Sequence, residues 1–477
     1  MLWKNRAFVT SDGHRRSSNA IESHVHQRHS LIILRFLRFI HHANSYYFIH
    51  NNFTMDTSAT TTSTAQQQLS TDKVRQMIAA CEQGHLHTIQ SLVSEHALYA
   101  SQQDDATGRS PLMAAAHAGN GALCQFLLKA GAPWNAVDRQ GQCAGNYATN
   151  AQHWGVVNVL VDWGVQAELI LGHVERQLRQ TTGETFASST STSPRPVSHE
   201  PSTKPEYLEQ RLHYTDNGRA LLDADQDAVM MEWERPLMKA HAQILMQHTA
   251  NNNTQSHIRK TVLNVGFGMG IIDTILQTEH SPEKHYIIEA HPDVYQKMIH
   301  DKWNEKPNVV ILFGKWQDIL PQLIQQGVQI DAVFYDTYGE HALDMEDFHA
   351  LMVQVLSKPH GVYSFFNGLA PDNLFFHGVA CQVVKLQLGQ LGLDSEFLSC
   401  EFQAPTNWQG VRRPYWAEHN NTYYLPVCTW NPQYLQTGTI APNAIVEQAK
   451  QNVLNNQKRE TTTEDASAKR QRQGAWL

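Results

Sequence analysis

Apolar residues follow two different periods in two successive regions of this chain. Between residues 70 and 172, short apolar stretches at helical spacing alternate with glycine-containing turns. Between residues 262 and 336, continuous apolar runs alternate with amphipathic stretches, the sequence pattern of parallel strands joined by helices. The pattern therefore predicts a small all-α domain followed by an α/β domain.

The first region repeats with a period of about 33 residues. The best copy runs through Gly108–Gly119, Leu123–Ala132 and Asn135–Gly141, and Ala79–His85 and Val156–Gly164 belong to weaker copies. This pattern resembles the ankyrin repeat, in which helix pairs bury their apolar faces by stacking and degenerate end copies act as caps.

Two glycines of the repeats, Gly131 and Gly164, fit the left-handed position that ends a helix. The repeat pattern specifies the fold but not a ligand. A concave face that binds a protein and a simple brace for the next domain therefore remain equal alternatives.

The second region contains four apolar runs that we interpret as strands. They are the run from Val262 into Gly266, His285–Glu289, Val309–Phe313 and Asp331–Tyr335. Ligands of such folds bind across the carboxyl ends of the strands. Glu289 and Asp336, which stand at two of these ends, are therefore candidate site residues.

A glycine-rich turn, Gly266, Gly268 and Gly270, follows the first run. Glycines let the backbone approach a ligand closely and turn into a helix. The G-x-G-x-G spacing favours S-adenosylmethionine over NAD, whose sites prefer G-x-G-x-x-G. A carboxylate about 20 residues later, here Glu289, is placed to accept both ribose hydroxyls.

Composition narrows the function classes further. The formal charge is −8, from 37 Lys+Arg and 45 Asp+Glu, which excludes a globally basic nucleic-acid binder. The six cysteines form no C-x-x-C pair, which argues against a zinc site and fits a reducing compartment. The longest apolar runs are shorter than 18 residues, so we expect no membrane-spanning helix.

We expect five segments along the chain: a disordered or non-native extension (1–69), ankyrin repeats (70–172), a Ser/Thr/Pro-rich linker (173–205), the chemistry-bearing domain (206–432) and a largely disordered tail (433–477). The Arg-rich, acid-poor residues 1–54 match a mitochondrial address, or else precede a working start at Met55. Basic pairs in the tail, Lys458-Arg459 and 469–472, match a nuclear address or a solvated tail.

Six blocks in order resemble guanidinoacetate methyltransferase: Val229–Met238, Leu263–Ile271, Tyr286–Glu289, Leu312–Trp316, Phe334–Tyr338 and Lys358–Gly361. With the repeats in front, residues 70–432 resemble the type IV protein arginine methyltransferases of fungi and plants. The resemblance implies an α/β Rossmann-like class I methyltransferase domain preceded by a small all-α ankyrin-repeat domain. It also implies S-adenosyl-L-methionine as cofactor and methylation of the internal δ nitrogen of arginine.

The resemblance also implies a role for each matching residue. Glu234 and Asp336 would be catalytic and grip the guanidino group, and Asp336 would also border the cofactor. The residues that would surround the cofactor are Tyr207, Met238, Gly266, Phe267, Gly268, Met269, Gly270, Ile271, Ile272, Glu289, Ala290, His291, Trp316 and Gln317. Asn264, where many methyltransferases carry an acid, and His360, where the turn expects glycine, depart from the pattern without touching its chemistry.

The residue types agree with this chemistry. A guanidinium has a pKa of about 12.5–13.8 and no free lone pair, so the nucleophile is the difficulty. Paired carboxylates can orient its planar fork and draw its charge away from the attacking nitrogen. One of them, or a water beyond it, can then accept the proton.

Several residues also have simpler interpretations. Asp223–Glu234 mimics a calcium loop, but Ala228 replaces the glycine that the loop requires, so we expect no metal. We interpret His291 and His377 as core or surface residues rather than bases, and Trp233 as a core residue. Glu234 as a merely solvated helix acid is the alternative to its catalytic role.

Three function hypotheses remain: a protein arginine methyltransferase, a small-molecule guanidino methyltransferase, and a non-enzymatic ankyrin protein with an inactive methyltransferase fold. The repeats favour the first, and the intact glycines and acids oppose the third. By resemblance, the expected partner is an arginine-containing protein such as a ribosomal protein, with neither membrane nor nucleic acid. The expected location is cytoplasmic and nuclear.

Overall fold

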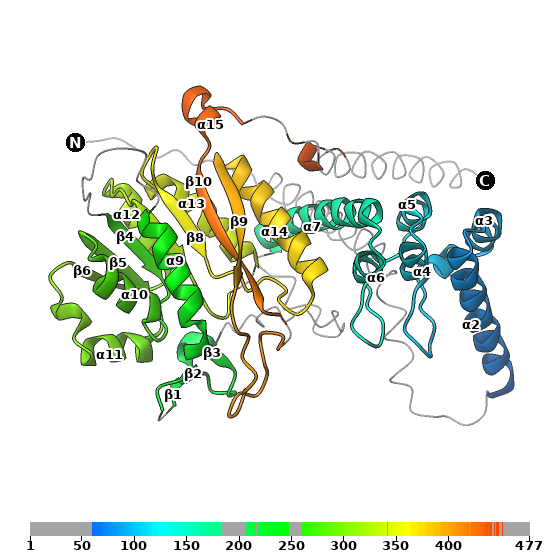
Figure 1. Ribbon diagram of the computed structural model, residues 1–477, viewed down its shortest axis with the longest axis horizontal. Helices are drawn as coiled ribbons and strands as arrows, with labels where there is room; N and C mark the ends of the chain where they lie inside the picture. The colour runs from blue at the N-terminus through cyan, green and yellow to red at the C-terminus, as the bar shows by residue number, and fades with distance from the viewer. Residues whose placement is uncertain are drawn as a thin grey trace, which may run out of the picture.

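The computed structural model describes residues 60–182, 206–247 and 260–447, apart from 216, 341, 419, 441, 442 and 444, together with 451 (Figure 1). The proposed N-terminal address, most of the expected linker and the basic pairs of the tail lie outside the described residues.

The repeat domain consists of stacked antiparallel helix pairs. In the described residues they are α2 (Thr60–Glu82) with α3 (Leu86–Glu95), α4 (Pro111–His117) with α5 (Gly121–Lys129), and α6 (Ala144–Asn150) with α7 (Trp154–Thr182), with the short 3₁₀ turn η2 (Ala97–Ala100) after the first pair. One continuous apolar core runs through all three pairs. The predicted ankyrin repeats are therefore confirmed as a three-pair stack.

The helix boundaries of the repeats follow local chemistry, with one error in our reading. At the start of α4, the Ser110 side chain accepts a hydrogen bond from the Met113 N–H (3.2 Å). Gly131 has φ +98° and ends a helix as predicted. Gly164 does not: it lies inside α7, where a Cβ would come within 2.8 Å of the Trp134 ring. Close packing, not chain reversal, requires this glycine.

Helix α7 is the outlier of the repeats because of its length. Residues 173–182, expected to be linker, continue this helix, and α2 begins ten residues before the expected boundary at 70. By length and composition alone, Trp154–Gln177 is apolar enough to cross a membrane. The helix carries Asp162 and Glu168 and its buried side chains belong to the repeat core, so we assign it to the stack.

The second domain is built on a seven-stranded sheet in the order β6-β5-β4-β7-β8-β10-β9. Its strands are β4 (Thr261–Val265), β5 (Lys284–Glu289), β6 (Val309–Phe313), β7 (Ala332–Tyr335), β8 (Val362–Phe365), β9 (Leu393–Glu401) and β10 (Thr422–Trp430). The first five are parallel, and β10 enters antiparallel between β8 and β9. This arrangement confirms the predicted Rossmann-like fold.

Helices cover both faces of this sheet (Figure 1). The buried side chains of one face come from α9 (Arg235–Gln247), α10 (Ile271–Ile275) and α11 (Pro292–His300). Those of the other come from α12 (Trp316–Gln325), α13 (Ala342–Val355) and α14 (Leu374–Gln390). The shorter helical segments are η3 (Tyr207–Glu209), η4 (Glu232–Glu234), η5 (Leu276–His280), η6 (Trp303–Glu305) and α15 (Pro432–Thr437).

A small antiparallel sheet precedes the large one. It consists of β1 (His213–Tyr214), β2 (Ala220–Leu222) and β3 (Ala228–Met231).

At the C-terminal end of the domain, Tyr434 of α15 stacks on Trp430 with ring centroids 5.9 Å apart. The catalytic domain therefore extends past the expected boundary at 432.

Helix α14 joins the two domains, because its side chains belong to the core of the repeats as well as to that of the sheet. Phe375 is 6% exposed and lies so close to Gly145 of α6 that a Cβ there would be 2.1 Å from its ring. The Asn373 side chain donates to Asn146 Oδ1 (2.7 Å). In Figure 1, α14 lies beside α7 at this junction.

Salt bridges add a second link between the domains. Arg176 of α7 contacts Glu346 (2.7 Å) and Asp347 (2.6 Å) of α13, and Arg179 contacts Asp344 (3.3 Å). Helix α13 directly follows the loop after β7. The repeats therefore brace the segment that carries a candidate site residue.

Candidate active site

The candidate site lies where the strand order of the sheet reverses. Strand β4 has β5 on one side and β7 on the other, so their carboxyl ends open a crevice at a topological switch point. Gly266 follows β4, Glu289 ends β5 and Asp336 follows β7. The three strand-end residues singled out from the sequence therefore meet at one edge of the sheet.

The glycine turn needs its glycines for close approach. Gly266 has φ +92°, and a Cβ there would lie 1.9 Å from the backbone oxygen of Asp336. Gly270 has φ +67° and begins α10. A Cβ on Gly268 would lie 3.0 Å from Met230 Sδ, a sulfur that also accepts from the Met269 N–H (3.3 Å). The turn therefore lies directly between β7 and β3.

Glu289 holds this turn in shape. It is 7% exposed, and its two oxygens accept hydrogen bonds from the N–H groups of Phe267 (2.9 Å) and His291 (2.6 Å). Burial raises the pKa of Glu289, and these N–H donors oppose that rise. Its ribose-binding role stays a prediction, and Ala290 is half-buried beside it.

Two carboxylates from distant segments of the chain, Glu234 and Asp336, interact electrostatically. Glu234 ends η4, directly before α9, and is 3% exposed; its Oε1 accepts from the Met231 N–H (2.8 Å) and from the Tyr415 hydroxyl. Burial, and then the charge of Asp336, raises the pKa of Glu234 well above the usual range. Burial likewise raises the pKa of Asp336, whose Oδ2 is buried without a partner among the described residues. The pair can therefore accept a cationic donor.

The Tyr207 ring packs against residues that follow β5 and β7. Its ring lies 4.9 Å from that of His291 and 5.0 Å from that of Tyr338, and its carbonyl faces His291 Nε2 (3.1 Å). Burial, followed by the nearby Glu289 carboxylate, raises the pKa of its hydroxyl. The contact of Tyr207 with a cofactor stays a prediction.

Trp316 and Gln317 share a partner that sequence reasoning missed. Glu340 accepts from Trp316 Nε1 (2.8 Å), Gln317 Nε2 (3.1 Å), Thr337 Oγ1 (2.7 Å) and the Tyr335 hydroxyl. This carboxylate connects the loop after β7 to the start of α12. A glutamate four residues after Asp336 was the available signal.

Other predicted cofactor residues belong to the turn or pack beneath it. Met238 is fully buried and packs with Ile271 and Ile272, while Phe267 packs against Trp303 at 5.1 Å between ring centroids. Met269 packs on both of these clusters. These side chains support the turn from the core, and their contact with a cofactor stays a prediction.

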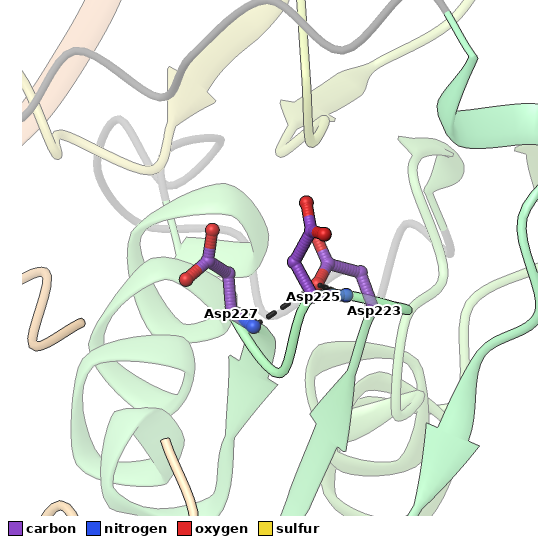
Figure 2. A group of neighbouring side chains, drawn as sticks. All are labelled: Asp223, Asp225 and Asp227. Atoms are coloured by element: carbon purple, nitrogen blue, oxygen red, sulfur yellow. Dashed lines mark hydrogen bonds between the residues drawn. The ribbon is translucent and has the colours of Figure 1, made fainter. Parts of the chain in front are cut away.

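The calcium-like loop is the turn between β2 and β3 (Figure 2). Asp223 Oδ1 accepts from the N–H groups of Asp225 (2.9 Å) and Asp227 (3.0 Å). The carboxylates of all three lie within 4.8 Å of one another. Asp227 also binds the guanidinium groups of Arg412 (2.5 Å) and Arg413 (2.6 Å), which supply its positive partners.

His291, His377 and Trp233 are buried or packed, as their interpretation as core residues requires. His377 and His291 are 5% and 1% exposed, and burial lowers the pKa of both. Trp233 is packed among Phe402, Tyr415 and Trp416 at 5.6 to 5.9 Å between ring centroids.

These features fit a nucleotide-like cofactor next to a guanidinium site. The glycine turn packs so closely on the Asp336 backbone that a Cβ at Gly266 would overlap the carbonyl, and Asp336 Oδ2 is a buried acceptor in need of a donor. Fold and site together define a Rossmann-like domain of the methyltransferase class fused to ankyrin repeats.

Comparisons with known proteins identify the family. Residues 199–375 match the sequence model of guanidinoacetate N-methyltransferase, and residues 77–169 match that of ankyrin repeats in three copies. A protein arginine N-methyltransferase 2 from Aspergillus fumigatus is 33% identical over 74% of this chain and 85% of its own length. The same-named protein of Yarrowia lipolytica is 42% identical over 47% of each chain. The chain therefore belongs to the protein arginine N-methyltransferase 2 family.

Among solved structures, M. jannaschii TYW2 in complex with AdoMet is similar at 15% identity. The alignment covers 46% of this chain and 84% of that one, with a TM-score of 0.28.

Proposed function

We propose that this protein transfers a methyl group from S-adenosyl-L-methionine to the δ nitrogen of an arginine in a protein substrate. The observation that carries the proposal is the carboxylate pair beside the Gly266 turn: Glu234 is buried, and Asp336 is half-buried with its Oδ2 enclosed. Membership of the protein arginine N-methyltransferase 2 family supports the cofactor and the reaction class.

When bound, S-adenosylmethionine supplies an electrophilic methyl group on a positively charged sulfur. The turn at Gly266–Gly270, with Glu289 and the indole of Trp316 at its borders, would hold this cofactor at the switch point. Glu234 and Asp336 would bind the two terminal nitrogens of the guanidinium fork. Their hydrogen bonds orient the plane and concentrate positive charge on those nitrogens.

The δ nitrogen is then the nitrogen left free of carboxylates. Methyl transfer to this nitrogen would release the cofactor as a neutral thioether and would require the nitrogen to lose one proton. A carboxylate whose pKa is raised by burial is a competent acceptor for that proton at neutral pH. Asp336 and Glu234 both meet this condition.

A small-molecule guanidino methyltransferase is the second candidate, because the match at residues 199–375 is to the guanidinoacetate enzyme. The repeats favour a protein substrate, since their outer surface offers an area for docking that a metabolite does not need. We also propose a ribosomal protein as the substrate and cytoplasm and nucleus as the locations. A fluorescent fusion with and without residues 452–477, which carry the basic pairs, tests the locations, and unchanged distribution removes the tail as an address.

The decisive test is methyl transfer from labelled S-adenosylmethionine into purified ribosomal proteins, total protein and deproteinised extract of the same cells. Labelled protein is hydrolysed and its methylarginines are separated by mass spectrometry, which distinguishes the δ from the terminal isomers. Label in small guanidino compounds only would overturn the proposal in favour of the second candidate. Cofactor binding without any label would favour the non-enzymatic alternative.

A further inference from the structure

The segment between β9 and β10 crosses the small sheet next to the site. We call residues 403–418 the strap. Its Arg412 N–H donates to the Gln226 carbonyl (2.8 Å), and Arg412 and Arg413 both bind Asp227. Asp227 is 6% exposed, so its carboxylate is a buried anchor for two half-exposed guanidinium groups. The strap is therefore tied to the β2–β3 turn shown in Figure 2.

Two residues past these arginines, the strap delivers one side chain to the carboxylate pair. The Tyr415 hydroxyl donates to Glu234 Oε1. Its ring lies between Trp233 (5.6 Å between centroids) and Trp408 (5.1 Å), so its position is set by packing as well as by the hydrogen bond. Tyr415 and Glu234 are 181 residues apart in the chain.

The contact leaves the two oxygens of Glu234 unequal. Oε1 accepts from both the Met231 N–H (2.8 Å) and the Tyr415 hydroxyl, while the described residues offer no hydrogen bond to Oε2. An oxygen with two donors is satisfied, and rotation of the carboxylate would break both bonds. Glu234 is therefore held with Oε2 as the acceptor available to a ligand.

We propose that Tyr415 is a positioning residue for Glu234, that it fixes Oε2 as the oxygen that meets the substrate guanidinium, and that Asp227 keeps it in place through the strap. The inference rests on the proposed function. The inference adds a condition to the proposed function: the site is complete only while the salt bridges of Arg412 and Arg413 with Asp227 are formed.

The same hydrogen bond stabilises the charged form of Glu234. The titratable groups that interact with Glu234 are Asp336, which follows β7, Tyr415 of the strap and Tyr423 of β10. Burial and the Asp336 charge raise the Glu234 pKa, and the Tyr415 hydroxyl lowers it. Removing this hydroxyl must therefore raise the Glu234 pKa further, and with it the pH at which the enzyme becomes active.

The test is the pH profile of kcat/KM for Tyr415→Phe, which keeps the ring and removes only the donor. We expect the acid limb to move up by about one to two pH units, as for the loss of one hydrogen bond to a charged group. Below that limb kcat/KM falls about tenfold or more. The dissociation constant for S-adenosylmethionine stays unchanged. Tyr424→Phe, on strand β10, is the matched control and should reproduce the wild-type profile.

Asp227→Asn tests the anchor without touching the site. It should shift the acid limb in the same direction, whereas Asp225→Asn, whose carboxylate lies 3.6 Å from Arg412 on the exposed side, should not. Coincident profiles for wild type and Tyr415→Phe overturn the positioning role, and equal profiles for the two Asp variants overturn the anchor. A wild-type enzyme that is inactive on arginine substrates refutes the proposed function instead, so the two failures are distinguishable.

Discussion

Asp336 should oppose stability while supporting activity. Its Oδ2 is buried without a partner among the described residues, and burial raises its pKa. A carboxyl with a raised folded-state pKa binds its proton more tightly in the folded than in the unfolded protein. The free energy of unfolding therefore decreases as pH rises from about 4, the unfolded pKa, through the folded pKa.

Asp336→Asn removes this penalty without changing the shape of the side chain. An unsatisfied buried acceptor costs about 1–3 kcal/mol, so removing the charge of Asp336 should stabilise the variant by about this amount at pH 8. In a domain of this size that corresponds to a Tm increase of about 3–9 °C. The gain should vanish below about pH 3, where the wild-type carboxyl is protonated in both states.

The same substitution should cost activity. A charge-assisted hydrogen bond is worth about 1.5–3 kcal/mol, so the loss of one or two from the guanidinium lowers kcat/KM by about 10–10⁴-fold. S-adenosylmethionine binding, followed by calorimetry, should persist. Asp318→Asn, an exposed acid in the first turn of α12, is the control for both measurements. Unchanged turnover would remove Asp336 from the mechanism, and a lower Tm at pH 8 would refute the burial argument.

Three further predictions concern the turn, the domain junction and pH. Gly266→Ala should abolish cofactor binding, because its Cβ would overlap the Asp336 carbonyl. Gly378→Ala, which has open space around it in a helix, should be tolerated, and equal cofactor binding by the two variants would contradict the role of Gly266 in the turn. Phe375→Ala should lower the free energy of unfolding by about 3–5 kcal/mol in a urea titration, because it leaves a cavity in the repeat core. A decrease of less than about 1 kcal/mol would contradict a core shared by the two domains. Wild-type kcat/KM should rise with pH through a limb above the ordinary carboxyl range, because Glu234 must ionise against burial; a limb at about pH 4 would disagree.

The sequence predicted those parts of the site that lie on local patterns. The glycine spacing, and the acids at the ends of β5 and β7, follow directly from strand periodicity, and the structure brings them together. The repeats were equally predictable, because each copy has the sequence pattern of the same helix pair. Their boundaries were not: the length of α7 depends on α14 and α13, which lie far along the chain.

Tyr415 and Glu340 could not be predicted in the same way. Tyr415 reaches Glu234 only because a strap without helix or strand periodicity crosses the small sheet, and its anchors are single ion pairs. Glu340 serves four donors that no spacing rule connects. The prediction for Gly164 was wrong for a different reason. The repeat period was correct, but the glycine is required by close packing against the Trp134 ring and not by a turn.

The insertion of Phe375 into the repeat core also limits how this architecture can vary. A stack of helix pairs can ordinarily lengthen by duplication, because each new pair presents the same apolar face to the next. Here the last pair presents that face to α14, so the enzyme itself is the terminal cap of the array. A fourth pair has no place to insert at this end without displacing the catalytic domain. Growth of the array is therefore open only on the α2 side, away from the site.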